Sequence, residues 1–81
     1  MYFFRLSLIP SLTDSLLYRG EVDGTHEVYV VLNEEARTVL PCDAHGRPVG
    51  PYPGFPTLSA HLLGQRKREG RPPLVITRYF A

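Results

Sequence analysis

Residues 41–56, PCDAHGRPVGPYPGFP, hold five of the eight prolines and three of the seven glycines of this chain. Proline fixes φ and offers no backbone N–H, so a β-ladder or a helix cannot run through such a stretch. We expect a brief hairpin around residues 43–46 and an extended chain after it. Regular structure must therefore form on either side of residues 41–56.

The chain before residue 41 has the pattern of β-strands. Tyr2–Ile9 alternates its side chains as a strand does, and Pro10 ends the pattern. Residues 11–14 leave two alternatives open: a short helical turn capped by Ser11 or Thr13, or a loop that leads into the next strand.

The strongest local signal is Asp23-Gly24, which stands between the β-rich runs LLYRGEV and HEVYVVL. Asp-Gly in this position predicts a hairpin, because glycine supplies the positive φ that the turn needs. The second run is apolar on both of its faces, which indicates an interior strand. Residues 33–36 then predict another turn, and Arg37–Leu40 a further strand.

The chain after residue 56 predicts one helix and one strand. Thr57 is the expected N-cap, and Gly70 the residue that ends the helix in a left-handed conformation. Pro72-Pro73 forbids continuation of the helix, and Leu74–Phe80 is rich in β-branched and aromatic residues. The helix has a narrow apolar stripe made of Leu58, Leu62 and Leu63.

These elements predict an α+β fold in the order β-β-β-β-α-β. We expect a single compact domain over residues 1–81, with an antiparallel sheet of four to five strands and the helix packed on one face. The lone Cys42 excludes an internal disulfide and fits a reducing compartment such as the cytoplasm. No apolar run approaches the roughly 20 residues of a membrane helix, so we expect no membrane span.

The net charge of +1 hides two regions of opposite sign. Residues 21–35 hold five carboxylates and no Lys or Arg, and residues 64–78 hold five cations and one carboxylate. Two solvated surfaces of opposite sign are one interpretation, and partner binding is the other. The residues of these regions that we expect at a binding surface are Glu34, Glu35, Arg66, Lys67, Arg68 and Arg71.

The basic segment has a structural explanation as well as a functional one. Cations in the last turn of a helix complement its dipole, and glycine followed by proline ends a helix. Gly70-Arg71-Pro72 matches the core of the AT-hook, a DNA-binding element, but Glu69 stands where the hook has its first arginine. Phosphates would repel this carboxylate, so the hook interpretation fails. Contact with phosphates or with an acidic partner remains open.

The proline-rich stretch adds two aromatic side chains, Tyr52 and Phe55, to the expected partner-binding residues. Aromatic groups on a stiff backbone are effective anchors for protein recognition, although both could instead cover the sheet edge and the helix start. Cys42, His45 and His61 offer three possible metal ligands where a structural zinc site uses four. We expect no metal, no cofactor and no catalytic dyad.

Together these features predict a small non-catalytic protein that acts by protein–protein contact. Inhibitors and adaptors encoded by phages or mobile elements are of this size. The alternative is nucleic-acid binding through the basic segment and Arg78, with Tyr79 available for stacking. The terminal strands, both rich in aromatic residues, should pair with each other or else offer an edge for assembly. A monomer and a homodimer both remain possible.

Overall fold

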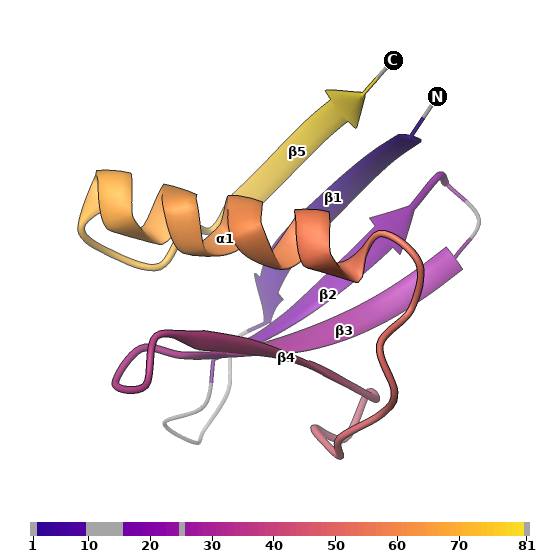
Figure 1. Ribbon diagram of the computed structural model, residues 1–81, viewed down its shortest axis with the longest axis horizontal. Coiled ribbons are helices and arrows are strands. Elements are labelled where there is room, and N and C mark those ends of the chain that lie inside the picture. Colours follow the sequence, from indigo (N-terminus) through magenta and orange to yellow (C-terminus); the bar gives the residue numbers. More distant parts are fainter. Residues whose placement is uncertain (1, 10–15, 25, 81) are drawn as a thin grey trace.

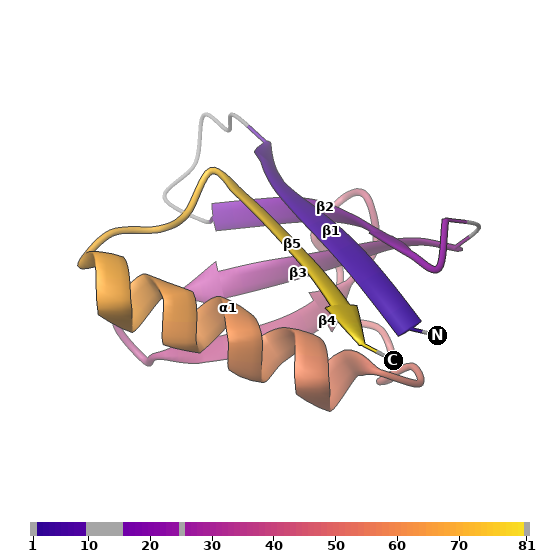
Figure 2. The same ribbon diagram turned by 90° about the horizontal axis from the view of Figure 1, so that it is seen from above.

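A computed structural model describes residues 2–9, 16–24 and 26–80, without the side chains of Tyr2, Tyr79 and Phe80. The alternatives for residues 11–14 and the proposed stacking by Tyr79 lie outside the described parts. Two layers form the molecule, one antiparallel sheet of five strands and one helix across a single face of it (Figures 1 and 2). The predicted fold class is confirmed. The elements are β1 (Tyr2–Ile9), β2 (Leu16–Val22), β3 (His26–Asn33), β4 (Thr38–Cys42), α1 (Phe55–Glu69) and β5 (Val75–Phe80).

The sheet has the order β4-β3-β2-β1-β5, so consecutive strands are neighbours except where the helix intervenes. β1 pairs with both β2 and β5, and Phe4 lies opposite Val22 on one side and Arg78 on the other. The two aromatic-rich terminal strands therefore pair with each other, as one of the two alternatives predicted, and β5 also forms an edge of the sheet. The chain's two ends meet at one end of the sheet, because β1 and β5 run antiparallel (Figure 1).

The core lies between α1 and the sheet face beneath it. The alternation of β1 sends Phe4 and Leu6 into the core, and both are fully buried. Leu58 and Leu62 reach the same cluster from the helix, with Leu63 partly buried beside them, which confirms the predicted apolar stripe. The other buried members are Tyr18, Val22, Val30, Leu32, Val39 and Ile76.

Tyr18 joins the core to the segment that leads into β5. Its hydroxyl donates a hydrogen bond of 2.7 Å to the carbonyl of Pro73, within the buried interior. Burial raises the pKa of Tyr18 to about 12, and the charges of Glu34 and Glu69 act in the same direction. The hydroxyl therefore stays protonated and keeps this bond at neutral pH.

The two ends of α1 can be compared with the ends predicted at Thr57 and Gly70. The expected N-cap at Thr57 is wrong: the helix begins at Phe55, after Gly54 with φ of 86° and with Pro56 in its first turn. Proline is tolerated there because the first N–H groups of a helix have no intrahelical acceptor. The predicted end is confirmed, since Gly70 has φ of 74° and its N–H donates to the carbonyl of Arg66 at 3.0 Å.

Strand β4 runs further than predicted, through Pro41 and Cys42, and Arg37 belongs to the turn before it. The expectation that regular structure stops at Pro41 is wrong, because β4 is an edge strand and proline is tolerated on an edge. The carbonyl of Pro41 accepts a hydrogen bond from the N–H of Val49, so the loop lies along this edge. The predicted hairpin around residues 43–46 is confirmed by the bonds Asp43 N–H to Arg47 O and Gly46 N–H to Asp43 O.

Candidate partner-binding groove

The acidic and basic regions of the sequence meet in the folded chain. The Nε of Arg66, in the last turn of α1, lies 2.6 Å from a carboxylate oxygen of Glu34, in the turn between β3 and β4. The two residues are 32 positions apart, and the packing of α1 across the sheet brings them together. The two charged regions are therefore not separate poles at this point of the surface.

A groove of about 490 Å³ opens beside this ion pair, between the C-terminal half of α1 and the β3–β4 turn. We call it the cationic groove. Its apolar part comes from Leu32, which is 2% exposed, and from Leu63, which is partly buried. Its charged part comes from one carboxylate and three cations, which gives a formal charge of +2. The lining residues are Leu32, Glu34, Arg37, Leu63, Arg66 and Lys67.

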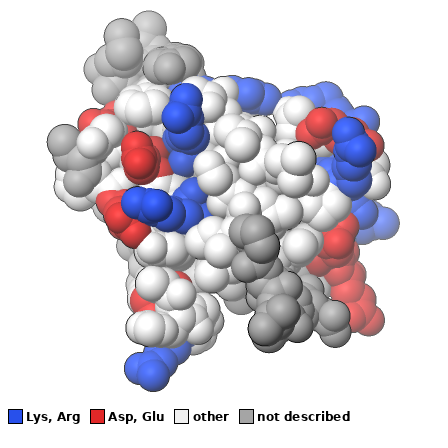
Figure 3. Space-filling model, turned by 180° about the vertical axis from the view of Figure 1, so that it is seen from behind, with Lys and Arg blue, Asp and Glu red and all other residues white. Residues whose placement is uncertain are grey.

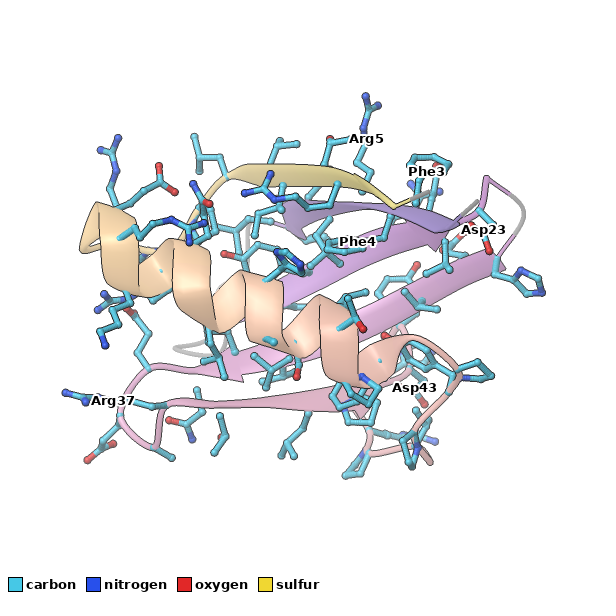
Figure 4. The ribbon with its side chains drawn as sticks, turned by 45° about the horizontal axis from the view of Figure 1, so that its top comes forward. Phe3, Phe4, Arg5, Asp23, Arg37 and Asp43 are labelled. Carbon is cyan, nitrogen blue, oxygen red and sulfur yellow. The ribbon has the colours of Figure 1, made fainter. Side chains whose placement is uncertain are left out.

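Arg37 occupies an uncommon backbone conformation at the rim of the groove. Its φ is 56°, in the left-handed region that glycine and asparagine prefer and arginine does not. The turn itself is held by Asn33, whose side-chain oxygen accepts a hydrogen bond of 2.9 Å from the N–H of Ala36. The Arg37 side chain extends past the turn, away from the body of the molecule (Figure 4). Within the described part of the chain, no carboxylate lies within 4 Å of Arg37 or Lys67.

The remaining predicted basic residues lie outside the groove. Arg68 and Arg78 both donate to the side-chain oxygen of Gln65, at 2.7 Å and 2.8 Å, and Arg78 also donates to the carbonyl of Thr77. Arg71 is exposed and follows the glycine that ends the helix. Glu35 is exposed within the β3–β4 turn. None of these four residues lines the groove.

Tyr52 and Phe55, the predicted aromatic anchors, lie at the opposite end of α1 from the groove. Their rings meet edge to face, with centroids 5.5 Å apart and an angle of 76° between the planes. Both are partly buried against the core. Tyr52 lines a second hollow of about 480 Å³, whose wall is mostly apolar. A role for either residue in binding stays a prediction, separate from the cationic groove.

Glu27, another carboxylate of the acidic region, has its partners within the sheet. Glu27 forms an ion pair with Arg19 at 3.3 Å and accepts a hydrogen bond from the hydroxyl of Tyr29, which lowers the pKa of Glu27. These three residues lie on the sheet face that α1 does not cover. Figure 3 shows that uncharged atoms occupy the middle of this open face and charged side chains its sides. Leu17, Val31 and Leu40 lie in register across β2, β3 and β4.

Cys42, which the sequence offered as a possible metal ligand and nucleophile, is buried. Burial raises the pKa of the Cys42 thiol, and the nearby Asp43 carboxylate adds to this effect, so the thiolate nucleophile is disfavoured. The Asp43 side chain accepts hydrogen bonds from the N–H groups of His45 and Arg47, which shape its own turn. In residues 2–9, 16–24 and 26–80, no three His, Cys, Asp or Glu side chains could hold a metal ion.

The structure adds Arg37, Leu32 and Leu63 to the site that the sequence predicted. Arg37 was assigned to a strand, Leu63 to the apolar stripe of the helix, and Leu32 to an interior strand that is apolar on both faces. The sequence offered one signal for Arg37: it is a cation beside the turn that follows Asn33. The groove itself depends on how α1 crosses the sheet, which local sequence patterns do not specify.

No α-helix in the described residues is long and apolar enough to cross a membrane. Comparison of the chain with protein families, with curated proteins and with solved structures found no match.

Proposed function

We propose that this chain is a non-catalytic protein-binding module that engages a partner through the cationic groove, as an inhibitor or adaptor does. The observation that carries the proposal is the combination, in one groove, of an apolar floor at Leu32 and Leu63 with the cations of Arg37, Arg66 and Lys67. Protein recognition uses apolar contact for affinity and charge for specificity and rate of encounter.

Nucleic-acid binding is the second candidate, and the position of Arg37 supports it. Arg37 adds a cation from the β3–β4 turn to those that the helix end supplies. Two observations favour a protein partner nevertheless. Glu34 lies inside the groove with Glu35 in the same turn, and carboxylates repel phosphates. The leucine floor also offers nothing that a phosphate or sugar requires.

Panning a library of displayed peptides tests the proposed function. Three forms of the protein serve as bait: the natural chain, Lys67→Glu in the groove, and Arg47→Glu as a matched charge change in the loop after β4. We expect peptides that bind the natural chain and Arg47→Glu but are lost with Lys67→Glu. Enrichment that is equal on all three baits would contradict the groove as the binding site.

Binding assays at about 50 mM salt test the second candidate, nucleic-acid binding, because phosphate contacts are strongest at low salt. The assays use single- and double-stranded DNA and RNA. Affinity that falls steeply as salt rises, and that Lys67→Glu abolishes, would favour nucleic acid over protein. We expect no binding that depends on Lys67 in this assay.

A further inference from the structure

We propose that the cationic groove binds an acidic peptide segment that carries an aliphatic side chain, and that Glu34 occupies the place of a partner carboxylate in the free protein. This inference rests on the proposed function and specifies the chemistry of the partner. Four observations support it: the charge of the groove, its apolar floor, the ion pair inside it and the backbone conformation of Arg37.

The charge of the groove selects an anion. Arg37 and Lys67 have no carboxylate within ion-pair distance among the described residues, whereas Arg66 has Glu34. Two cations are therefore left for a ligand, one on the turn and one on the helix, on two sides of the same hollow. A segment with two spaced carboxylates can reach both.

The apolar floor of the groove favours a ligand that has an apolar side chain as well as charged groups. Leu63 is only partly buried, and it lies with Leu32 beneath the charged rim. An aliphatic side chain placed against Leu63 would remove apolar surface of both partners from water. An acidic segment with one leucine-like residue between its carboxylates satisfies both the floor and the rim.

The ion pair inside the groove has the character of a replaceable contact. The side chains of Arg66 and Glu34 are 33% and 40% exposed, and ion pairs with such exposure contribute little to folding. A carboxylate of the partner can therefore take the place of Glu34 on Arg66 at small cost to the fold. Glu34 then acts as an internal competitor, which weakens binding of the acidic segment without preventing it.

The backbone of Arg37 is the independent sign that this side chain serves a ligand. Its left-handed conformation disfavours arginine relative to glycine, and no described hydrogen bond or ion pair of the side chain offsets that disadvantage. The turn is already held by Asn33. A contact between Arg37 and a partner accounts for a cation at a position where glycine would suit the fold better.

The test uses two dye-labelled synthetic peptides and fluorescence anisotropy at low salt. In one peptide a leucine is flanked by glutamates, and in the other the glutamates are glutamines. We expect the natural chain to bind the glutamate peptide more tightly than the glutamine peptide by about tenfold or more, since two ion pairs are lost. Amide shifts in an NMR titration should change at residues 32–37 and 63–67.

Variants of the groove then assign the contacts. Arg37→Gly and Lys67→Gln should each weaken the glutamate peptide several-fold, while Arg47→Gln, outside the groove, should leave it unchanged. Glu34→Gln should bind it about two- to fivefold more tightly, because the internal competitor is gone. Urea unfolding of each variant shows that the fold is intact, and Lys67→Gln remains informative if Arg37→Gly does not fold.

Several results would overturn the proposal. Equal affinity for the two peptides would mean that the groove does not recognise carboxylates. Weaker binding by Glu34→Gln would make Glu34 part of the site and not a competitor. Displacement of the peptide by a short oligonucleotide of higher affinity would assign the groove to nucleic acid. If panning yields groove-dependent peptides that are not acidic, only this inference fails; if it yields none, the proposed function fails as well.

Discussion

The turns at the two ends of β3 each contain a residue other than glycine with positive φ, and the two residues have different reasons for it. Asp23 has φ of 54° and Arg37 has φ of 56°. The Asp23 carboxylate accepts a hydrogen bond of 2.9 Å from the N–H of Phe3, which ties its turn to β1 (Figure 4). The Arg37 side chain extends outward from its own turn (Figure 4).

The same backbone conformation has an internal explanation at Asp23 and none at Arg37 among the described contacts. Aspartate tolerates the left-handed region better than most residues do. The hydrogen bond that the Asp23 carboxylate accepts from the N–H of Phe3 also offsets the cost of this conformation. Arginine has neither advantage at position 37. The fold therefore accounts for Asp23, whereas Arg37 lines the cationic groove, where the proposed contact with a partner would account for it.

Asp23→Ala should have the largest effect on stability. It removes the acceptor for the Phe3 N–H and places alanine in the left-handed region, for a combined loss of about 2 kcal/mol in the free energy of unfolding. Asp23→Asn keeps an acceptor and the backbone tolerance, so it should lose much less. Urea unfolding measures both, and an unchanged midpoint for Asp23→Ala would remove the structural explanation of this turn.

Asn33→Ala should have the next largest effect, about 1 kcal/mol, because the N–H of Ala36 loses its side-chain acceptor. The contrast between Asp23 and Arg37 requires that Asn33, and not Arg37, holds the β3–β4 turn. If Asn33→Ala unfolds at the same urea concentration as the natural chain, this turn is held by contacts other than the Asn33 side chain.

Arg37→Gly should change the free energy of unfolding by less than about 1 kcal/mol, since relief of the left-handed conformation opposes the greater entropy of glycine in the unfolded chain. Asp23→Gly, the same replacement at the other turn, should be more destabilising because it loses the bond to Phe3. Equal losses at the two positions, measured in parallel urea titrations, would erase the contrast between the turns.

Glu34→Gln should have the smallest effect on stability, within about 0.5 kcal/mol, because its ion pair with Arg66 is partly exposed to solvent. The small difference from the natural chain should shrink further as salt is added, since salt screens such pairs. A loss that exceeds that of Asn33→Ala would mean that Glu34 is needed for the fold and is not a replaceable occupant of the groove.

The sequence was informative wherever local chemistry determines structure. Asp23-Gly24 indicated a turn because both residue types favour positive φ, and Gly70 indicated the helix end for the same reason. Arg37 gave no such indication, because arginine has no preference for the conformation that it adopts. Thr57 was misleading, since a residue that suits an N-cap is not one when Gly54 has already begun the helix.

The candidate site was only partly predictable because it is made by contacts over long sequence separations. Arg66, Lys67 and Glu34 were identified by charge alone, as members of two regions with no stated relation. Their meeting depends on the direction in which α1 crosses the sheet and on the length of β3, neither of which is encoded in a short motif. The floor at Leu32 and Leu63 depends on the same packing.

The pairing of β1 with β5 has a practical consequence for work with this protein. Tyr2 and Phe80 lie opposite each other, so both chain ends leave the molecule at the end of the sheet remote from the β3–β4 turn (Figure 1). A tether attached at either end would present the groove outward. The two ends are also close enough for a short linker, so a circular permutant opened within residues 43–54 would keep every strand of the sheet intact.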